Sequence, residues 1–339
     1  MHERGSVIVG IDNGATKNNV TVLDSSGRFL IDRMLEVPSR VTAGTGPALD
    51  ALAETFDTGL RITGIDRSAV RAVGLDTPGP ASADGVISSK GATNFALPEW
   101  WGFDVRGALE NRLGIPVVYS NDGNAAALYA HYEHHGDDAP HKSSVAAIVG
   151  TGLGGGVIEA GTVVRGASGM AGELGHVHIP MDGLLGEGQP VPRCNCGFVG
   201  DVESVASLTG IRVNLLPYWL TRYPDHELAR LPIDDAAKAL RSWGERGDEM
   251  ARQVFEQQAM AIGRLFTIAA NFTDPNTYFV GGGVVEAAPE FRDWYVSVVR
   301  ANTHLRLEQL DVAEISLVPQ LDMAGARGAA VAARHEFPI

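Results

Sequence analysis

Cysteine is scarce in this chain of 339 residues, which has only Cys194 and Cys196, separated by one residue. So short a separation is poor geometry for a disulfide, so we expect reduced thiols and a cytoplasmic protein. Long hydrophobic runs are also missing, since no apolar stretch approaches the roughly 18 residues of a membrane helix. Residues 1–6 lead straight into an apolar stretch, and no secretory signal is expected.

Positive charge is in deficit, with 27 Lys and Arg against 41 Asp and Glu and a net charge of −14. Nucleic acid and anionic membranes are bound through basic faces, so neither is expected as the main partner. A small anionic ligand is still compatible, because backbone amides and one lysine suffice to hold it. The length exceeds one ordinary core and predicts two α/β domains that face each other across a cleft.

The stretch 119–127 follows an apolar strand and opens an alanine-rich helix. Asn121, Asp122 and Asn124 therefore lie where a strand passes into a helix N-terminus. The helix amides stabilise an ionised carboxylate there, and an ionised aspartate can take the proton of a substrate hydroxyl. The alternative is that Asp122 is only an N-cap and Asn121 a turn residue.

Three glycine-rich turns follow apolar strands, at residues 12–17, 150–156 and 281–283. Glycine lets backbone amides approach a phosphate closely. In the first turn, Asp12 can hold Mg²⁺ through water, while Thr16 and Lys17 can donate to phosphate. An ordinary hairpin with a polar tip, or a flexible linker in the second case, is the alternative.

Two segments with potential ligand residues lie between the second and third glycine turns, one with Glu173 and His176 and one with Cys194 and Cys196. Glu173 and His176 are three residues apart and offer a carboxylate acceptor and an imidazole donor to neighbouring hydroxyls. Cys194 and Cys196, followed by an oxygen ligand and preceded by a histidine, are compatible with a tetrahedral structural zinc site. Two reduced cysteines without a metal are the alternative.

The hydrophobic pattern predicts strands and helices in alternation after an antiparallel start. The polar segment 76–80 is expected to be a loop. Strands are expected at 7–11, 19–23, 29–37, 69–75, 115–119, 144–149, 157–158, 277–280 and 313–318, and helices at 46–58, 104–113, 208–216, 233–246, 248–271, 288–302 and 324–335.

Together these motifs resemble the ROK family of sugar kinases and repressors, in the actin-like ATPase superfamily. They follow the family's order over nearly the whole chain. The matching stretches are Asp12-x-Gly14-x-Thr16-Lys17, Thr77-Pro78-Gly79-Pro80, Asn121-Asp122-x-Asn124-Ala125-Ala126, the glycine turn 150–156, Gly172-Glu173-Leu174-Gly175-His176, Cys194-x-Cys196-Gly197-x-x-Gly200-x-x-Glu203 and Gly281-Gly282-Gly283.

The resemblance implies a two-domain, ribonuclease H-like α/β fold, with residues 1–122 and a C-terminal helix 324–339 in one domain and residues 123–323 in the other. It implies a homodimer that phosphorylates a sugar with ATP and Mg²⁺ to give a sugar 6-phosphate. Asp122 would be the catalytic base. The other implied roles are sugar binding by Asn94, Asn121, Glu173, His176 and Glu203, nucleotide, phosphate or Mg²⁺ binding by Asp12, Gly14, Thr16, Lys17, Thr151, Gly152, Gly282 and Gly283, and Zn²⁺ binding by His176, Cys194, Cys196 and Asp201.

The chain departs from the family pattern at three places. Ala15 stands where a second glycine is common, Asp201 stands where a third cysteine is usual, and the interval between His176 and Cys194 is longer. These differences keep another substrate open, such as an N-acetylhexosamine, fructose, mannose or a cyclitol, and polyphosphate as donor. A sugar-responsive repressor is not expected, because no helix-turn-helix precedes Val7, and a non-catalytic sugar sensor is disfavoured by Asp122 and Lys17.

Overall fold

The computed structural model describes residues 5–79, 81–88 and 95–339, and it forms two compact α/β units. Unit 1 comprises Met1–His141, Gly156–Gly172 and Pro319–Ile339, and unit 2 comprises Lys142–Gly155 and Glu173–Val318. The mixed α/β fold is as predicted. The domain boundaries 1–122, 123–323 and 324–339 stay a prediction, and the compact units are drawn differently, with residues 123–141 and 156–172 in unit 1.

The sheet of unit 1 has five strands in the order β3-β2-β1-β4-β5. Strands β1 and β2 pair antiparallel, whereas β1–β4 and β4–β5 pair parallel. The predicted strand 29–37 was wrong in extent. Phe29 forms an isolated bridge to Leu23 of β2, and a strand that pairs with β2 is found only at Val37–Pro38, which is β3. The bounds are β1 Val7–Asn13, β2 Lys17–Leu23, β4 Val70–Thr77 and β5 Val117–Asn121.

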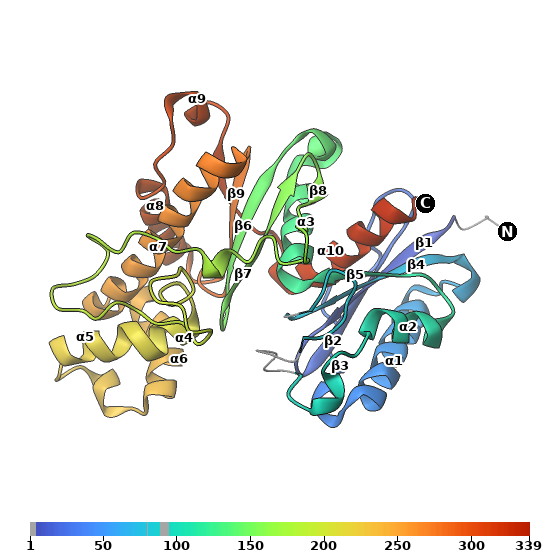
Figure 1. Ribbon diagram of the computed structural model, residues 1–339, viewed down its shortest axis with the longest axis horizontal. Helices are drawn as coiled ribbons and strands as arrows, with labels where there is room; N and C mark the ends of the chain where they lie inside the picture. Colours follow the sequence, from blue (N-terminus) through green and yellow to red (C-terminus); the bar gives the residue numbers. More distant parts are fainter. Residues whose placement is uncertain (1–4, 80, 89–94) are drawn as a thin grey trace. The chain divides into compact units, whose positions relative to one another are not determined.

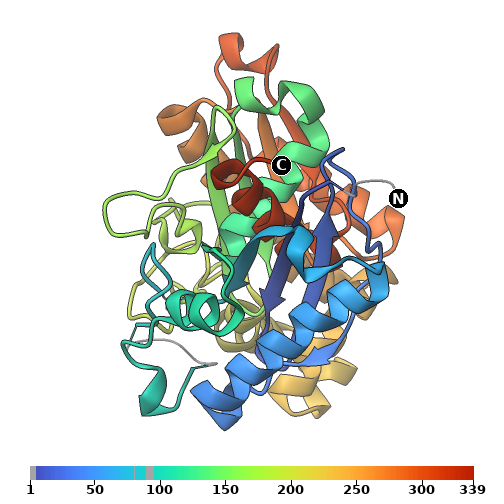
Figure 2. The ribbon, with the colours of Figure 1, turned by 90° about the vertical axis from the view of Figure 1, so that its right-hand side faces the viewer.

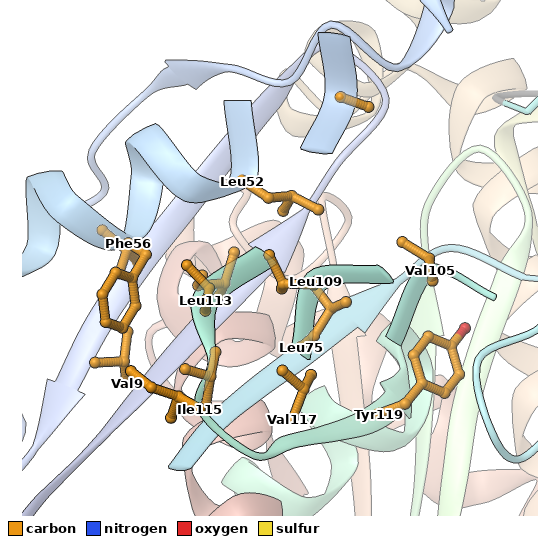
Figure 3. Packing of buried hydrophobic residues seen from close by; sticks show 14 of the residues in the cluster. Val9, Leu52, Phe56, Leu75, Val105, Leu109, Leu113, Ile115, Val117 and Tyr119 are labelled. Carbon is orange, nitrogen blue, oxygen red and sulfur yellow. The ribbon is translucent and has the colours of Figure 1, made fainter. Parts of the chain in front are cut away.

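Helices cover both faces of this sheet (Figures 1 and 2). One face carries α1, Thr45–Thr63, and α2, Val105–Leu113, each of which ends at a glycine in the left-handed region. Figure 3 shows the core they enclose, in which Leu52 of α1 and Leu109 of α2 lie over Leu75 of β4. Burial of such aliphatic side chains, at about 25 cal/mol per Å², is the main force that holds the layers together.

The other face carries α10, Leu321–Glu336, beside α3, Asp122–His135. Helix α10 lies close to the sheet because glycines of β1 and β4 face it. A Cβ on Gly10 would lie 2.0 Å from the Ala326 carbonyl oxygen, and one on Gly74 would lie 1.9 Å from that of Ala329. The C-terminal helix is therefore packed directly against the first two parallel strands of unit 1.

The second sheet repeats this topology in the order β8-β7-β6-β9-β10, with β6–β9 and β9–β10 parallel. The boundary between the units falls within β7, between residues 155 and 156. The strands are β6 Ser144–Val149, β7 Leu153–Glu159, β8 Thr162–Val163, β9 Thr277–Gly282 and β10 Glu314–Leu317. The helices are α4 Leu208–Gly210, α5 Leu216–Arg222, α6 Ile233–Glu245, α7 Glu249–Thr273, α8 Pro289–Ala301 and α9 Leu307–Leu310.

Within the described ranges, none of the helices combines the length and the apolar character that crossing a membrane requires.

Candidate active site

Three acidic residues of unit 1 gather where β1, β4 and β5 end. Asp12 lies near the end of β1 and pairs in register with Asp76 of β4. Asp76 in turn pairs with Ser120 of β5, two residues before Asp122. Because parallel strands end at one edge of a sheet, residues distant in sequence become neighbours there.

Asp122 is the first residue of α3, and its side chain is exposed. Its Oδ1 accepts a hydrogen bond from the Gly123 amide at 2.7 Å, and Asn121 Oδ1 accepts from the same amide at 3.0 Å. Asn121 is thus the N-cap residue, and the alternative that Asp122 caps the helix was wrong. Asp122 thus lies where the amides of the first helical turn interact favourably with a negative charge.

Two buried carboxyl groups at this edge of the sheet, those of Asp12 and Asp76, have raised pKa values. Asp76 is fully buried, and burial raises its pKa well above the usual value, with the charges of Asp12 and Asp122 adding to the effect. Burial also raises the pKa of Asp12, which a hydrogen bond to Asp76 lowers in part. Among the described residues, the Asp76 oxygens find no N–H or O–H donor, so a proton shared with Asp12 is the hydrogen bond open to this pair.

The first glycine motif forms the tight turn of the β1–β2 hairpin. The Gly14 amide donates to the Lys17 carbonyl oxygen at 3.0 Å, and a Cβ on Gly14 would lie 2.7 Å from that oxygen. Thr16 and Lys17 are exposed at its tip. The Lys17 ammonium is paired with Glu36, and since both side chains are about half exposed, the pair is weak and can be exchanged for a phosphate.

The turn between β6 and β7 in unit 2 is tied to Glu203. Glu203 Oε2 accepts from the Leu153 amide at 2.8 Å, and a Cβ on Gly152 would lie 2.6 Å from the same oxygen. The Thr151 carbonyl accepts from the Thr209 amide at 3.1 Å, which joins the turn to α4. The predicted phosphate residues Thr151 and Gly152 thus adjoin the predicted sugar residue Glu203.

The third glycine motif lies at the same edge of that sheet. Gly282 pairs with Val149 of β6, and a Cβ on Gly282 would lie 1.9 Å from the Val149 carbonyl oxygen. Its φ of 104° is in the region that favours glycine. Gly283 follows, and its carbonyl accepts from Arg241. Close backbone packing therefore requires glycine at position 282 before any ligand is considered.

The predicted zinc ligands form one group in unit 2. The candidate ligand atoms of His176, Cys194, Cys196 and Asp201 all lie within 4.8 Å of one another. His176 Nδ1 lies 3.1 Å from Asp201 Oδ2, 3.6 Å from Cys196 Sγ and 4.0 Å from Cys194 Sγ. These residue types are the ones that bind zinc. Tetrahedral zinc with bonds of 2.0–2.3 Å requires ligand separations of about 3.3–3.8 Å, so the more distant atoms of the group, up to 4.8 Å apart, would have to move closer.

The protonation of the thiols matters for that fit. Desolvation raises the pKa of Cys194, and the acids Asp201 and Glu203 raise it further. Cys194 Sγ donates to Glu203 Oε1 at 3.4 Å. Without a cation Cys194 is therefore a neutral thiol, and a metal would have to displace its proton.

Glu173 and His176 lie at the two ends of one short turn. The His176 amide donates to the Glu173 carbonyl at 3.1 Å. Desolvation raises the pKa of Glu173, Glu203 raises it further and His176 lowers it. Since Nδ1 of His176 faces the cysteines, Nε2 is the ring nitrogen left for a sugar hydroxyl. Asn94, the other predicted sugar residue, lies outside the described residues.

Sequence reasoning missed Asp76, which was assigned to a loop. Strand β4 continues through Asp76 and Thr77, and Thr77 Oγ1 hydrogen-bonds the Tyr119 hydroxyl at 2.8 Å. An acid that directly follows the apolar run 72–75 was the available signal, because a carboxylate at the carboxyl edge of a parallel sheet lies where ligands bind.

The fold is an α/β fold of the actin-like ATPase type. It has two sheets of one topology, an acid near the end of the first hairpin strand, and glycine turns in corresponding positions of the two sheets. The model of the ROK family matches residues 8–336. The chain belongs to the ROK family, as its motifs predicted.

Individual proteins agree with this assignment. The chain is 32% identical to the glucokinase of Halalkalibacterium halodurans, over 82% of this chain and 81% of that protein. It is 31% identical to an N-acetyl-D-glucosamine kinase of Salmonella paratyphi A, over 81% and 83%.

Two solved structures are similar as well. The ROK hexokinase of Thermus thermophilus has a TM-score of 0.75 at 30% identity, covering 97% of this chain and 98% of that one. A ROK family glucokinase of Streptomyces griseus, in complex with glucose and AMPPNP, has a TM-score of 0.70 at 28% identity, covering 97% and 100%.

Proposed function

We propose that this protein is an ATP-dependent sugar kinase that phosphorylates a hexose hydroxyl, with Asp122 as the general base. The observation that carries the proposal is the position of Asp122. It begins α3, its carboxylate is oriented by the Gly123 amide, and Asn121 rather than Asp122 caps the helix. A carboxylate kept ionised at a helix N-terminus can take the proton of a hydroxyl as that hydroxyl attacks phosphorus.

The sugar hydroxyls are assigned to polar side chains of the predicted sugar-binding set. We assign the Nδ2 group of Asn121 to one hydroxyl, since its Oδ1 is used in the cap. Glu173, Nε2 of His176 and Glu203 are assigned to others, and Asn94 is assigned by family resemblance alone. Several such bonds fix the hydroxyl in line with the phosphate, which accounts for much of the rate of a phosphoryl transfer.

The phosphates of ATP are assigned to the glycine turns. Thr16 and Lys17 have exposed donors, and the Gly14 turn brings backbone amides near them. Thr151, Gly152, Gly282 and Gly283 are assigned to the nucleotide by family resemblance. Mg²⁺, held through Asp12, would neutralise phosphate charge during the transfer.

The substrate is assigned to the hexoses, with glucose first and N-acetylglucosamine second. The glucokinase and N-acetyl-D-glucosamine kinase relatives, at nearly equal identity, favour these two. A structural Zn²⁺ on His176, Cys194, Cys196 and Asp201 is also proposed, where it would stiffen the segment that carries His176. The homodimer and the cytoplasmic location rest on family resemblance and on the reduced cysteines.

A coupled ADP-release assay with Mg²⁺-ATP tests the proposal against glucose, N-acetylglucosamine, mannose, fructose and a cyclitol. Sugar-dependent turnover that Asp122→Asn abolishes would support it and identify the substrate. Sugar binding in a calorimeter without turnover on any sugar would replace it with a non-catalytic sensor.

A further inference from the structure

Asp76 is a buried acid that the proposed reaction leaves without a role. Its side chain is 0% exposed, and neither oxygen accepts a hydrogen bond from an N–H or O–H donor of the described residues. Burial of a carboxylate without donors is costly, and such groups are kept where they pair with a cation or coordinate a metal. The buried carboxyl group of Asp76 is therefore a candidate for binding a cation.

The backbone places Asp76 beside a second acid. Asp12 and Asp76 are in register on neighbouring parallel strands, so their side chains leave the same face of the sheet. They continue the two rows that begin with Gly10 and Gly74, the glycines against which α10 packs. Both carboxylates therefore lie under the N-terminal half of α10.

The helix approaches both carboxylates closely at Gly325. A Cβ on Gly325 would lie 3.0 Å from Asp76 Oδ2 and 3.1 Å from Asp12 Oδ2. The two oxygens thus converge on one position that an alanine side chain would occupy. Carboxylate oxygens that converge in this way are the donor set preferred by Mg²⁺ and Mn²⁺.

No basic side chain takes that position among the described residues. Lys17, the nearest lysine in the sequence, is paired with Glu36, and no ion pair joins Asp12 or Asp76 to an arginine or lysine of the described chain. The charge of Asp122 also acts on Asp76. A divalent cation would remove the repulsion among the three acids and leave Asp122 available as the base.

We propose that Asp76 is a direct ligand of a divalent cation, together with Asp12, and that unit 1 binds this cation before any nucleotide is present. The inference rests on the proposed function, because this cation would be the Mg²⁺ that binds the phosphates of ATP. Asp76 is a ligand in addition to Asp12, for which the sequence alone indicated contact with the cation through water. The site is selective for hard cations because its donor atoms are all oxygens.

The test is the binding of Mn²⁺ to the full chain without nucleotide or sugar, followed by the electron paramagnetic resonance signal of free Mn²⁺. The protein is first given one equivalent of Zn²⁺, which the sulfur-containing group around Cys194 takes in preference to an all-oxygen site, and unbound Zn²⁺ is removed. We expect Asp76→Asn to weaken Mn²⁺ binding at least tenfold, since loss of even an outer partner of a metal site costs about 10–100-fold. The matched control is Asp66→Asn, an exposed residue whose side chain caps nothing, and it should bind Mn²⁺ like the unaltered chain.

A thermal melt of the same variant distinguishes loss of a ligand from loss of the fold. In metal-free buffer Asp76→Asn should melt at about the same temperature as the unaltered chain, because the new amide can donate to Asp12 as the shared proton of the acid pair does. The stabilisation that Mg²⁺ adds to the unaltered chain should disappear in this variant and persist in Asp66→Asn.

The outcomes separate this inference from the proposed function. Equal Mn²⁺ affinity in Asp76→Asn and the unaltered chain, or no nucleotide-free binding by the unaltered chain, would overturn the inference even if the kinase assay succeeds. Mn²⁺ binding lost in Asp76→Asn would sustain the site even if no sugar is phosphorylated.

Discussion

Asp122→Asn is the substitution that separates catalysis from binding most clearly. The asparagine keeps an oxygen that can accept from the Gly123 amide, and Asn121 continues to cap α3. The substitution removes one exposed charge at a helix N-terminus, which costs only about 0.3–1 kcal/mol of stability. The fold and the position of the side chain should therefore survive.

The expected loss is in turnover. A general base contributes about 10²–10⁴-fold to a rate, equivalent to about 2.7–5.4 kcal/mol of barrier. We expect kcat to fall by that factor while the KM values for sugar and ATP change only a few-fold, because an amide cannot take the proton of the hydroxyl but still fills the same space.

The assay is ADP release with saturating Mg²⁺-ATP and the best sugar of the panel, with a thermal melt on the same preparation. Asp66→Asn serves as the control for loss of an exposed carboxylate. Turnover of Asp122→Asn within tenfold of the unaltered chain would refute the assignment of the base. A melting temperature lowered by more than about 4 °C would show that the side chain holds the fold instead.

Three further predictions concern packing, pH and metal. Gly74→Ala should lower the free energy of unfolding by about 3 kcal/mol or more in urea titrations, since its Cβ would meet the α10 backbone. The control Gly46→Ala in α1, whose Cβ would have nothing within 4 Å, should raise the free energy of unfolding by about 0.5–1 kcal/mol. Equal effects of the two substitutions would contradict the packing of α10 on β4. Burial lowers the pKa of His131 to about 4, below its value in the unfolded chain, so the unfolded chain binds the extra proton. Stability present above pH 6.5 should then fall as the pH drops toward 4, by up to about 1.4 kcal/mol per unit. His131→Gln should reduce that slope, and the lowered pKa of His335 accounts for part of what remains. Cys196→Ser should lose most bound zinc in elemental analysis, with Asp201→Asn reducing it less, whereas undiminished zinc in both would place the metal elsewhere.

Local motifs account for most of the site that could be predicted. Asp122 and its helix are adjacent in sequence, and the glycine turns at 14 and 152 each follow their own strand, so the pattern of apolar and polar residues reports them directly. The four metal candidates were also predicted. Cys194, Cys196 and Asp201 lie within eight residues of each other, and His176 belongs to the neighbouring family motif.

Strand ends at the functional edge were predicted too short. Strand β4 was expected to stop at residue 75 and runs through Thr77, β5 runs to Asn121, and β9 runs to Gly282. Polar and glycine residues are typical of loops in sequence, but here the backbone ladder continues through them because neighbouring strands supply the partners. The opposite error, the strand expected at 29–37, arose where most of an apolar segment has no strand to pair with.

The sequence by itself determined the family, the candidate base, and the alternation of strands and helices, because each is encoded by residues close together along the chain. Tertiary structure alone decided that Asp76 faces Asp12, since that meeting depends on the register of β1 against β4, 64 positions apart. It also decided that the last helix approaches both carboxylates at a glycine, Gly325. Register and helix packing are settled by burial of the whole core rather than by any local pattern.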